Sequence, residues 1–290
     1  MDQAKRLRDL INKHRAPMME LETNMRVIAV TSGKGGVGKT NFALNLAIYL
    51  ARARKRVVVV DADFGMANVE VLLGVSPRYS FKEILSGEVK VSDALTTGPE
   101  GVRFLSGGSG LTQLSDITES QMVKLISSFK QLEALTDILI IDTGAGISKT
   151  VTNFIKASHE TIVVTTSDPT AITDAYAVMK AIAENNSEPP ILKIVINRVE
   201  SQKEGLDVFS RLHRVSKRFL NMIPVNLGYI PYDRHLARAV KSQEPVALMY
   251  PNSDSSRSIE IISKRLLDEP VREVKGVRQF IDRWMSYMKK

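Results

Sequence analysis

A glycine-rich segment containing two lysines is the part of the sequence with the clearest chemical meaning. It runs Gly33-Lys34-Gly35-Gly36-Val37-Gly38-Lys39-Thr40 and matches the spacing GxxxxGK[ST]. Glycines at these positions let consecutive backbone N–H groups converge on phosphate oxygens, and the start of a following helix adds positive potential. Lys39 can reach the β- and γ-phosphates, and Thr40 can bind Mg²⁺. The segment, extended to Asn41, therefore predicts a site for a nucleoside triphosphate with Mg²⁺.

Carboxylates follow two further apolar runs. One run continues as Asp61-Ala62-Asp63-Phe64-Gly65-Met66-Ala67-Asn68, and the run ILIID ends at Asp142. Ligands of open α/β sheets bind outside the carboxyl ends of the strands, which is where these side chains would lie. Transfer of a phosphoryl group to water needs Mg²⁺ to offset charge and a group that orients the attacking water. The three aspartates are candidates for these roles; an Asp-rich turn that caps the next element is the alternative for the first pair.

These residues need a scaffold of parallel strands, and the hydrophobic pattern predicts one. Near-continuous apolar runs, typical of strands covered on both faces, occur at residues 26–31, 56–61, 137–142, 161–166, 192–197 and 226–230. Helical periodicity falls between them, at about 39–53, 118–133, 170–184, 203–220 and 255–267. This alternation predicts a doubly wound, mostly parallel sheet flanked by helices. Residues 98–116, rich in Gly and Ser, are expected to form a short edge strand and a loop.

Composition excludes several classes of protein. The chain has 290 residues, of which 43% are hydrophobic, and it contains no cysteine. The lack of cysteine excludes disulfides, thiolate zinc sites and cysteine-held iron–sulfur clusters. No apolar run approaches the ~18–20 residues that cross a bilayer, and the charged start of the chain lacks the apolar block of a secretory signal. We therefore expect a cytoplasmic protein.

The net charge of +8 is concentrated at the two ends of the chain. Residues 1–15 carry a net charge of +3 and residues 271–290 a net charge of +4, so the long middle part holds only +1. Proteins that bind duplex nucleic acid usually carry a basic face on the folded body. The charge distribution therefore does not favour binding to a specific nucleic acid, and it suggests that the two ends bind other partners.

The last segment of the chain has the pattern of an amphipathic helix. Its apolar residues follow helical spacing, with polar residues between them and Lys289 and Lys290 at the end; the stripe consists of Val277, Phe280, Ile281, Trp284, Met285 and Met288. Such a helix binds an anionic membrane surface weakly and reversibly, and two helices on one dimer bind together. The alternative is a helix that docks on the core of its own protein. Docking in one nucleotide state and release in another would satisfy both interpretations.

The second lysine in the loop gives the sequence a family resemblance. KGGxGKT, with Lys34 as its first residue, resembles the deviant Walker A motif of the MinD/ParA ATPases, within the SIMIBI division, and the resemblance covers about residues 25–265. In that family the first lysine reaches the nucleotide of a partner subunit, which implies an ATP-sandwiched homodimer. The resemblance also implies that Asp63 positions the attacking water, and that Asp61 and Asp142 support the Mg²⁺ shell.

Further positions resemble the nucleotide contacts of the family. Asn68 ends the element DxDxxxxN, and two later pairs, Asn197 with Arg198 and Pro231 with Asp233, stand where the family surrounds adenine and ribose. The pattern NRxE at Asn197 loosely resembles the guanine-reading NKxD. ATP is favoured over GTP, because the last residue is Glu and the surrounding pattern is MinD-like.

One residue departs from the family pattern. Gly144 follows Asp142 and Thr143, where the family commonly has a proline in D-[ST]-P-[AG]-G. Glycine is expected to make this switch II segment more flexible, and no ligand is lost.

The start of the chain carries a second, narrower resemblance. Residues 2–8 (DQAKRLR) resemble the DQAxxLR motif of the FlhG/YlxH subgroup, MinD-like ATPases that control flagellar number and placement. The subgroup implies that this segment stimulates FlhF, an SRP-type GTPase, and that Gln3 enters the active site of FlhF. Partner contacts are then expected from Asp2, Gln3, Ala4, Leu7 and Arg8, and flagellar basal-body (C-ring) proteins are further partners. A frayed basic helix is the alternative.

Together these features predict three parts of the chain: an activator helix and linker at 1–24, an ATPase domain at 25–268, and a linker with a membrane-targeting helix at 269–290. The resemblance implies an enzyme that converts ATP and water to ADP and phosphate, is cytoplasmic, and binds reversibly to the inner face of the cell membrane.

Three other functions stay open. A DNA-partitioning ATPase of the ParA type would need exposed basic residues on the body, such as Arg211, Arg214, Lys217 and Arg218 on one predicted helix. A division-site ATPase of the MinD type is the nearest relative, and lacks the N-terminal activator segment. A metabolic enzyme that transfers phosphate to a small molecule is the third.

Overall fold

Parallel strands form the centre of the molecule in the computed structural model, which describes residues 25–63, 68–108, 119–184, 189–268 and 280–285. The strands of the described residues pair in the order β3-β4-β2-β5-β1-β6-β7-β8, and every pairing is parallel except β3 with β4. The strands are β1 (Arg26–Ser32), β2 (Val57–Ala62), β3 (Thr96–Thr97), β4 (Arg103–Leu105), β5 (Ile138–Ala145), β6 (Glu160–Thr166), β7 (Ile191–Val199) and β8 (Val225–Pro231). The predicted fold class is confirmed.

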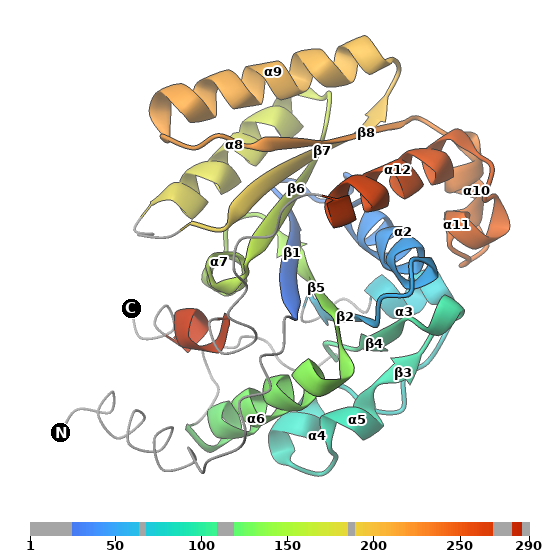
Figure 1. Ribbon diagram of the computed structural model, residues 1–290, viewed down its shortest axis with the longest axis vertical. Helices are drawn as coiled ribbons and strands as arrows, with labels where there is room; N and C mark the ends of the chain where they lie inside the picture. The colour runs from blue at the N-terminus through green and yellow to red at the C-terminus, as the bar shows by residue number, and fades with distance from the viewer. Residues whose placement is uncertain (1–24, 64–67, 109–118, 185–188, 269–279, 286–290) are drawn as a thin grey trace.

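Helices cover both faces of the sheet (Figure 1). On one face α2 packs with α10, α11 and α12; on the other, α4, α5 and α6 lie over one half and α7, α8 and α9 over the other. The described helices are α2 (Lys39–Arg52), α3 (Asn68–Leu73), α4 (Phe81–Ser86), α5 (Val91–Ala94), α6 (Glu119–Leu135), α7 (Lys149–Ala157), α8 (Pro169–Ala183), α9 (Gln202–Phe219), α10 (Arg234–Lys241), α11 (Val246–Met249) and α12 (Asp254–Asp268), with a 3₁₀ turn η1 (Pro99–Gly101).

The strands are rich in β-branched residues, which suit a pleated surface covered on both sides. Val57, Val58, Val59 and Val60 of β2 alternate between the two faces and are all essentially inaccessible to solvent. Predicted strand positions agree with the structure to within a few residues at each end; β5 continues three residues past Asp142. The short helices α3, α4, α5, α7, α10 and α11 were not predicted from the sequence, because four to nine residues give little periodicity.

The register of the sheet brings the acidic residues together. β2 and β5 are neighbours, and their pairing places Asp61 directly beside Asp142. β1 lies on the other side of β5, where Val30 pairs with Asp142 just before the glycine-rich loop. Segments far apart in the sequence therefore meet at the carboxyl edge of the central strands.

The C-terminal segment includes a short helix at residues 280–285, which lies between α6 and α7 in Figure 1. Its side chains Phe280, Ile281, Trp284 and Met285 are buried in the same apolar cluster as Phe129 and Phe154. The remaining stripe positions, Val277 and Met288, lie outside the described residues, as does the predicted activator segment 1–24. Among the helices that the structure describes, none has the length and apolar character needed to span a bilayer.

Candidate nucleotide-binding site

The glycine-rich loop connects β1 to α2, as the sequence predicts. β1 ends at Ser32, α2 begins at Lys39, and Gly38 is the residue before the helix. Gly38 has φ 91°, and a Cβ there would lie 2.4 Å from Nδ2 of Asn197, so both backbone angle and space require glycine. At Gly33 the backbone of α8 leaves no space for a side chain, because a Cβ there would lie 2.2 Å from the backbone of Asp174. The loop is thus held tightly between two elements.

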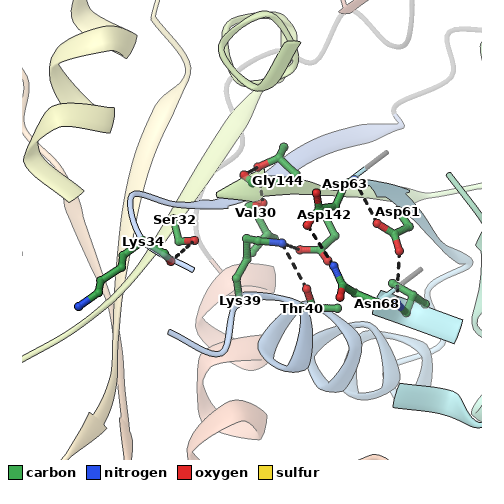
Figure 2. Close-up of polar contacts among 12 residues, drawn as sticks. Val30, Ser32, Lys34, Lys39, Thr40, Asp61, Asp63, Asn68, Asp142 and Gly144 are labelled. Carbon is green, nitrogen blue, oxygen red and sulfur yellow. Dashed lines mark hydrogen bonds and ion pairs between the residues drawn. The ribbon is translucent and has the colours of Figure 1, made fainter. Parts of the chain in front are cut away.

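Lys39 forms a buried ion pair with Asp142. Its Nζ lies 2.6 Å from Oδ1 of Asp142 and 3.2 Å from Oγ1 of Thr40 (Figure 2). The side chain of Asp142 is fully buried. Oδ2 of Asp142 has no hydrogen-bond partner among the described residues. Burial raises the pKa of Asp142, and the neighbouring Lys39 opposes the rise. Burial, followed by the charge of Asp142, raises the pKa of Asp61 to about 7.

This arrangement fits a divalent cation. The buried carboxylate of Asp142 contacts the ammonium group of Lys39, and its Oδ2 has no hydrogen-bond partner among the described residues. The buried carboxylate of Asp61 lies on the neighbouring strand, directly beside Asp142. Oxygen ligands from carboxylates and a hydroxyl are the ligands that Mg²⁺ prefers. Thr40, Asp61 and Asp142 are the residues that would hold Mg²⁺, either directly or through water.

Asp61 and Asp63 have different roles in the turn after β2. The Asp61 carboxylate accepts hydrogen bonds from the backbone N–H groups of Asp63 (3.1 Å) and Val69 (3.3 Å), so it also orders the turn. Asp63 lies at the cavity, and its Oδ2 accepts a hydrogen bond of 3.0 Å from Nδ2 of Asn68. The turn-capping alternative therefore describes part of what Asp61 does, while Asp63 is free to face a ligand.

The site opens into a cavity of about 1300 Å³. It is larger than the ~300–1,000 Å³ of typical ligand pockets and continues past the phosphate loop to the start of α7. Among the predicted residues, its lining includes Gly35, Gly36, Gly38, Lys39, Thr40, Asn41, Asp63, Asn68, Asn197, Arg198, Pro231 and Asp233. The cavity therefore has room for a triphosphate and for groups beyond its last phosphate.

At the other end of the cavity, Asn197 braces the loop. Its Nδ2 donates a 2.7 Å hydrogen bond to the carbonyl of Val37, and its Oδ1 accepts from the backbone N–H of Arg198 (2.9 Å). The side chain of Asn197 is thus occupied by the protein's own backbone. Tyr232, Leu236 and Val240 supply apolar surface at this end.

Asp233 links two helices beside the same end of the cavity. Its Oδ1 accepts from the N–H of His235 at the start of α10, and its Oδ2 accepts from the N–H and the hydroxyl of Ser255 at the start of α12. Burial opposes ionisation, but these hydrogen bonds outweigh it and lower the pKa of Asp233 to about 2. Its carboxylate has a structural role in addition to the predicted nucleotide contact.

Comparison with known proteins identifies the family. Residues 28–246 match the CobQ/CobB/MinD/ParA nucleotide binding domain. The chain is 37% identical to the antiactivator FleN of Pseudomonas aeruginosa over 247 residues, which cover 85% of this chain and 88% of FleN. The chain belongs to the MinD/ParA family of ATPases.

Two further members of the MinD/ParA family are similar over most or all of their length. The flagellum site-determining protein YlxH of Helicobacter pylori is 34% identical over 294 residues, with 99% of each chain covered. The septum site-determining protein MinD of Pyrococcus horikoshii, solved as a complex with Mg-ADP, matches with a TM-score of 0.67 at 25% identity, over 84% of this chain and 96% of that one. This MinD/ParA protein is therefore related to flagellar regulators.

The first lysine of the MinD/ParA motif lies apart from the rest of the site. Lys34 points away from Lys39 and Asp142 in Figure 2, and its Nζ donates a 2.8 Å hydrogen bond to the hydroxyl of Thr170 in α8. Five residues predicted for the nucleotide and metal site do not belong to the cavity lining: Gly33, Lys34, Val37, Asp61 and Asp142. Their predicted contacts with nucleotide or Mg²⁺ stay predictions, and the structure gives Gly33 and Val37 packing and bracing roles.

Sequence reasoning missed the wall that α7 supplies. Ser148 accepts a hydrogen bond from the N–H of Val151 and so begins the helix. Ser148, Lys149, Thr150, Val151 and Asn153 line the cavity. Ser148 shortly after the glycine-containing turn was the available signal, because serine is a preferred residue at helix starts.

Proposed function

We propose that this protein is an ATP-dependent dimerising switch that hydrolyses ATP to ADP and phosphate and regulates flagellar number and placement. The observation that carries the enzymatic part is the cluster of Lys39, Asp142 and Asp63 beside the loop, in which one carboxylate oxygen of Asp142 has no hydrogen-bond partner among the described residues. The flagellar part is supported by the similarity to FleN and YlxH.

In the proposed reaction the loop binds the phosphates of ATP through its backbone N–H groups. Lys39 exchanges Asp142 for the β- and γ-phosphates, and Asp63 orients the attacking water in line with the bond that breaks. Mg²⁺, held by Thr40 and Asp142 with support from Asp61, would offset the charge that develops on the phosphate oxygens. Asn197 keeps the loop in its binding conformation through Val37.

We propose that ATP joins two copies of the chain. Lys34 lies at the surface, and within the part of the chain that the structure describes its ammonium group is held by the Thr170 hydroxyl alone, which is a weak interaction in water. Its ammonium group is therefore available to reach the nucleotide of a partner subunit, as in the family motif. Release of phosphate would remove the ligand that both subunits share and return the monomer.

We propose that the C-terminal helix, which is docked on the body in this structure, binds the membrane when it is released. Trp284 is fully buried against Phe154, with ring centroids 5.3 Å apart, yet its Nε1 has no hydrogen-bond partner among the described residues. A buried donor without a partner costs about 1–3 kcal/mol. At a membrane interface the indole keeps an apolar environment and regains a polar partner, so release toward an anionic membrane is favoured over release into water.

The N-terminal segment is proposed to bind a partner GTPase. The motif at residues 2–8 supports a role in stimulating the GTPase FlhF, and flagellar basal-body proteins are the proposed targets. The protein would then act in the cytoplasm and reversibly at the inner face of the cell membrane.

One observation favours a second function, that of a DNA-partitioning ATPase. Arg211, Arg214, Lys217 and Arg218 are exposed along α9. The last three of them, with Phe209, Ser210 and His213, line a shallow surface depression. If this face bound DNA, binding to nonspecific duplex would fall steeply with salt and would survive deletion of residues 277–290.

The deciding experiment for the proposed function uses Asp63→Ala. The variant keeps the phosphate loop, Lys39 and Asp142 but lacks the water-orienting carboxylate, so it should bind ATP, hydrolyse it only very slowly and accumulate as a dimer. Light scattering after size exclusion with ATP and Mg²⁺ measures the mass, and ADP provides the control. A variant that stays monomeric with bound ATP would show that the switch assignment is wrong.

A further inference from the structure

Gly144 stands at a place where a side chain would collide with the catalytic carboxylate. It is the penultimate residue of β5, and its φ lies outside the left-handed region, so its backbone does not require glycine. A Cβ at this position would lie 3.1 Å from Oδ1 of Asp63 and 3.6 Å from a methyl carbon of Val151. The first distance is shorter than ordinary van der Waals contact, so either the Cβ or the carboxylate would have to move. The requirement for glycine is therefore one of space.

The second oxygen of the same carboxylate is held from the opposite side. Nδ2 of Asn68 donates a 3.0 Å hydrogen bond to Oδ2 of Asp63, and the Asp63 N–H is bound to Asp61. The carboxylate thus lies between the amide of Asn68 on α3 and the bare backbone of Gly144 on β5 (Figure 2). Two elements fix its direction before any nucleotide enters.

We propose that Gly144 is a positioning residue for ATP hydrolysis, which keeps open the space that the Asp63 carboxylate occupies, while Asn68 holds the other oxygen. This inference rests on the proposed hydrolysis of ATP. It adds a steric role to the expected flexibility of this glycine: Gly144 lies in β5 between Thr143, which pairs with β2, and Ala145, which pairs with β1 after a shift of register. Asn68 acts through Asp63 by the same logic and need not touch the nucleotide.

The consequence concerns rate rather than binding. Gly144 lines the cavity, and the three atoms nearest to a methyl group there belong to Asp63 and Val151 rather than to the phosphate loop. A methyl group would turn or push the carboxylate by a few tenths of an ångström. Errors of this size in the placement of a reacting group reduce rate, whereas ATP affinity depends on the loop and Lys39.

The test compares Gly144→Ala with the wild-type chain in single-turnover hydrolysis of ATP. We expect the rate constant to fall about 3- to 10-fold, while ATP affinity stays within twofold and the melting temperature is unchanged. Gly98→Ala is the matched control, because Gly98 has φ −102°, a Cβ there meets nothing closer than 3.4 Å, and Gly98 is not among the residues that line the cavity. An unchanged rate constant would overturn the inference. A fall in ATP affinity and melting temperature that accompanies the fall in rate constant would also overturn it, because the substitution would then disturb the whole site.

A second background separates positioning from a general structural effect. In Asp63→Ala the residual slow hydrolysis should not fall further when Gly144→Ala is added, because the group that Gly144 accommodates is gone. A second fall by the same factor would show that Gly144 does not act through Asp63.

Crystal structures of wild type and Gly144→Ala give a readout that does not depend on turnover. The Asp63 carboxylate should be displaced from residue 144 in the variant. If it is displaced but the wild-type chain does not hydrolyse ATP, the proposed function fails and the steric assignment survives. If it is not displaced, the inference is wrong.

Discussion

Lys39 is the residue on which stability and nucleotide binding make competing demands. Its ammonium group neutralises the buried Asp142 in the folded chain, at 2.6 Å, and the same group must bind phosphate in the proposed reaction. An ion pair with one carboxylate oxygen left unpartnered is incompletely satisfied. When ATP binds with Mg²⁺, its phosphates can therefore replace Asp142 as the partner of Lys39, because Mg²⁺ neutralises the carboxylate instead.

We predict that Lys39→Ala has two separable effects. Tight ATP binding should be lost, and the nucleotide-free protein should lose about 2–4 kcal/mol of unfolding free energy, because a buried carboxylate is left without its cation. Equilibrium denaturation in urea measures the second effect. Adding Asp142→Asn in the same background should restore most of the stability but not the binding. Equal instability of the single and double variants would contradict the ion-pair explanation.

A second prediction at this scale concerns Asp233 and pH. Its pKa is about 2 in the folded chain and 3.8 in its ordinary state, so its ionised form stabilises the fold above about pH 4, and this contribution is lost as the pH falls toward 2. Asp233→Asn should lower the unfolding free energy at pH 7 by about 1 kcal/mol, allowing for solvent screening.

The measurement is urea unfolding of both proteins between pH 7 and pH 3. The gap between wild type and Asp233→Asn should narrow as the pH falls. A gap that is constant with pH would mean that the hydrogen bonds to Ser255 and His235, rather than the charge, account for the effect.

At the scale of elements, α7 is the one that joins the site to the C-terminal helix. Val151 on its first turn lies 3.6 Å from where a Cβ of Gly144 would be, and Phe154 on the next turn stacks on Trp284 at an interplanar angle of 17°. Phe129 of α6 closes the same cluster, with its ring centroid 5.1 Å from that of Phe280. A shift of α7 on nucleotide binding would therefore change the packing beside Gly144 and the packing around Trp284.

We predict that the environment of Trp284, the only tryptophan, reports the nucleotide state. Acrylamide should quench its fluorescence weakly with ADP, because the ring is buried, and more strongly when ATP is added to the slowly hydrolysing Asp63→Ala chain. With anionic vesicles the quenching should fall again, as the ring enters lipid.

Sedimentation with the same vesicles provides the control for this prediction. The full chain should sediment with ATP and not with ADP, and a chain without residues 277–290 should not sediment in either state. Neutral vesicles should bind less, because Lys289 and Lys290 lose their counter-charge. Equal sedimentation of both chains would mean that the helix is not the membrane contact.

At the scale of the whole molecule, the charge separates into a nearly neutral body and two basic ends. The body carries the nucleotide site, and the helix at residues 280–285 returns to it. Release of this helix would uncover apolar residues of α6, α7 and the sheet, so its binding elsewhere must offset the loss of these contacts.

We predict that a peptide of residues 1–15 is sufficient to raise the GTP hydrolysis rate of the FlhF-type partner. Its basic residues would promote docking, and Gln3 would supply the polar side chain that enters the active site. Phosphate release measured with and without the peptide tests this. The peptide with Gln3→Ala keeps the charge and should have no effect; equal stimulation by both peptides would remove the role of Gln3.

The sequence by itself determined the features that depend on local order along the chain. Parallel strands buried on both faces need continuous runs such as RVVVVD, and the phosphate loop needs glycines next to a lysine, so strand positions, fold class and the loop from Gly33 to Thr40 could be predicted. Asp61 and Asp142 could be expected at the carboxyl edge of the sheet because each ends a run of this kind, and the structure places them side by side there.

Only the tertiary structure decided how distant segments meet. The place of the C-terminal helix, the bracing of the loop by Asn197 and the contact between Gly144 and Asp63 each join residues that are far apart in the sequence. A hydrophobic stripe is the same pattern whether it faces lipid or a groove of its own protein, and a glycine has no side chain to show what it accommodates. These roles depend on which surfaces come within a few ångströms of each other, and that is a property of the packed molecule.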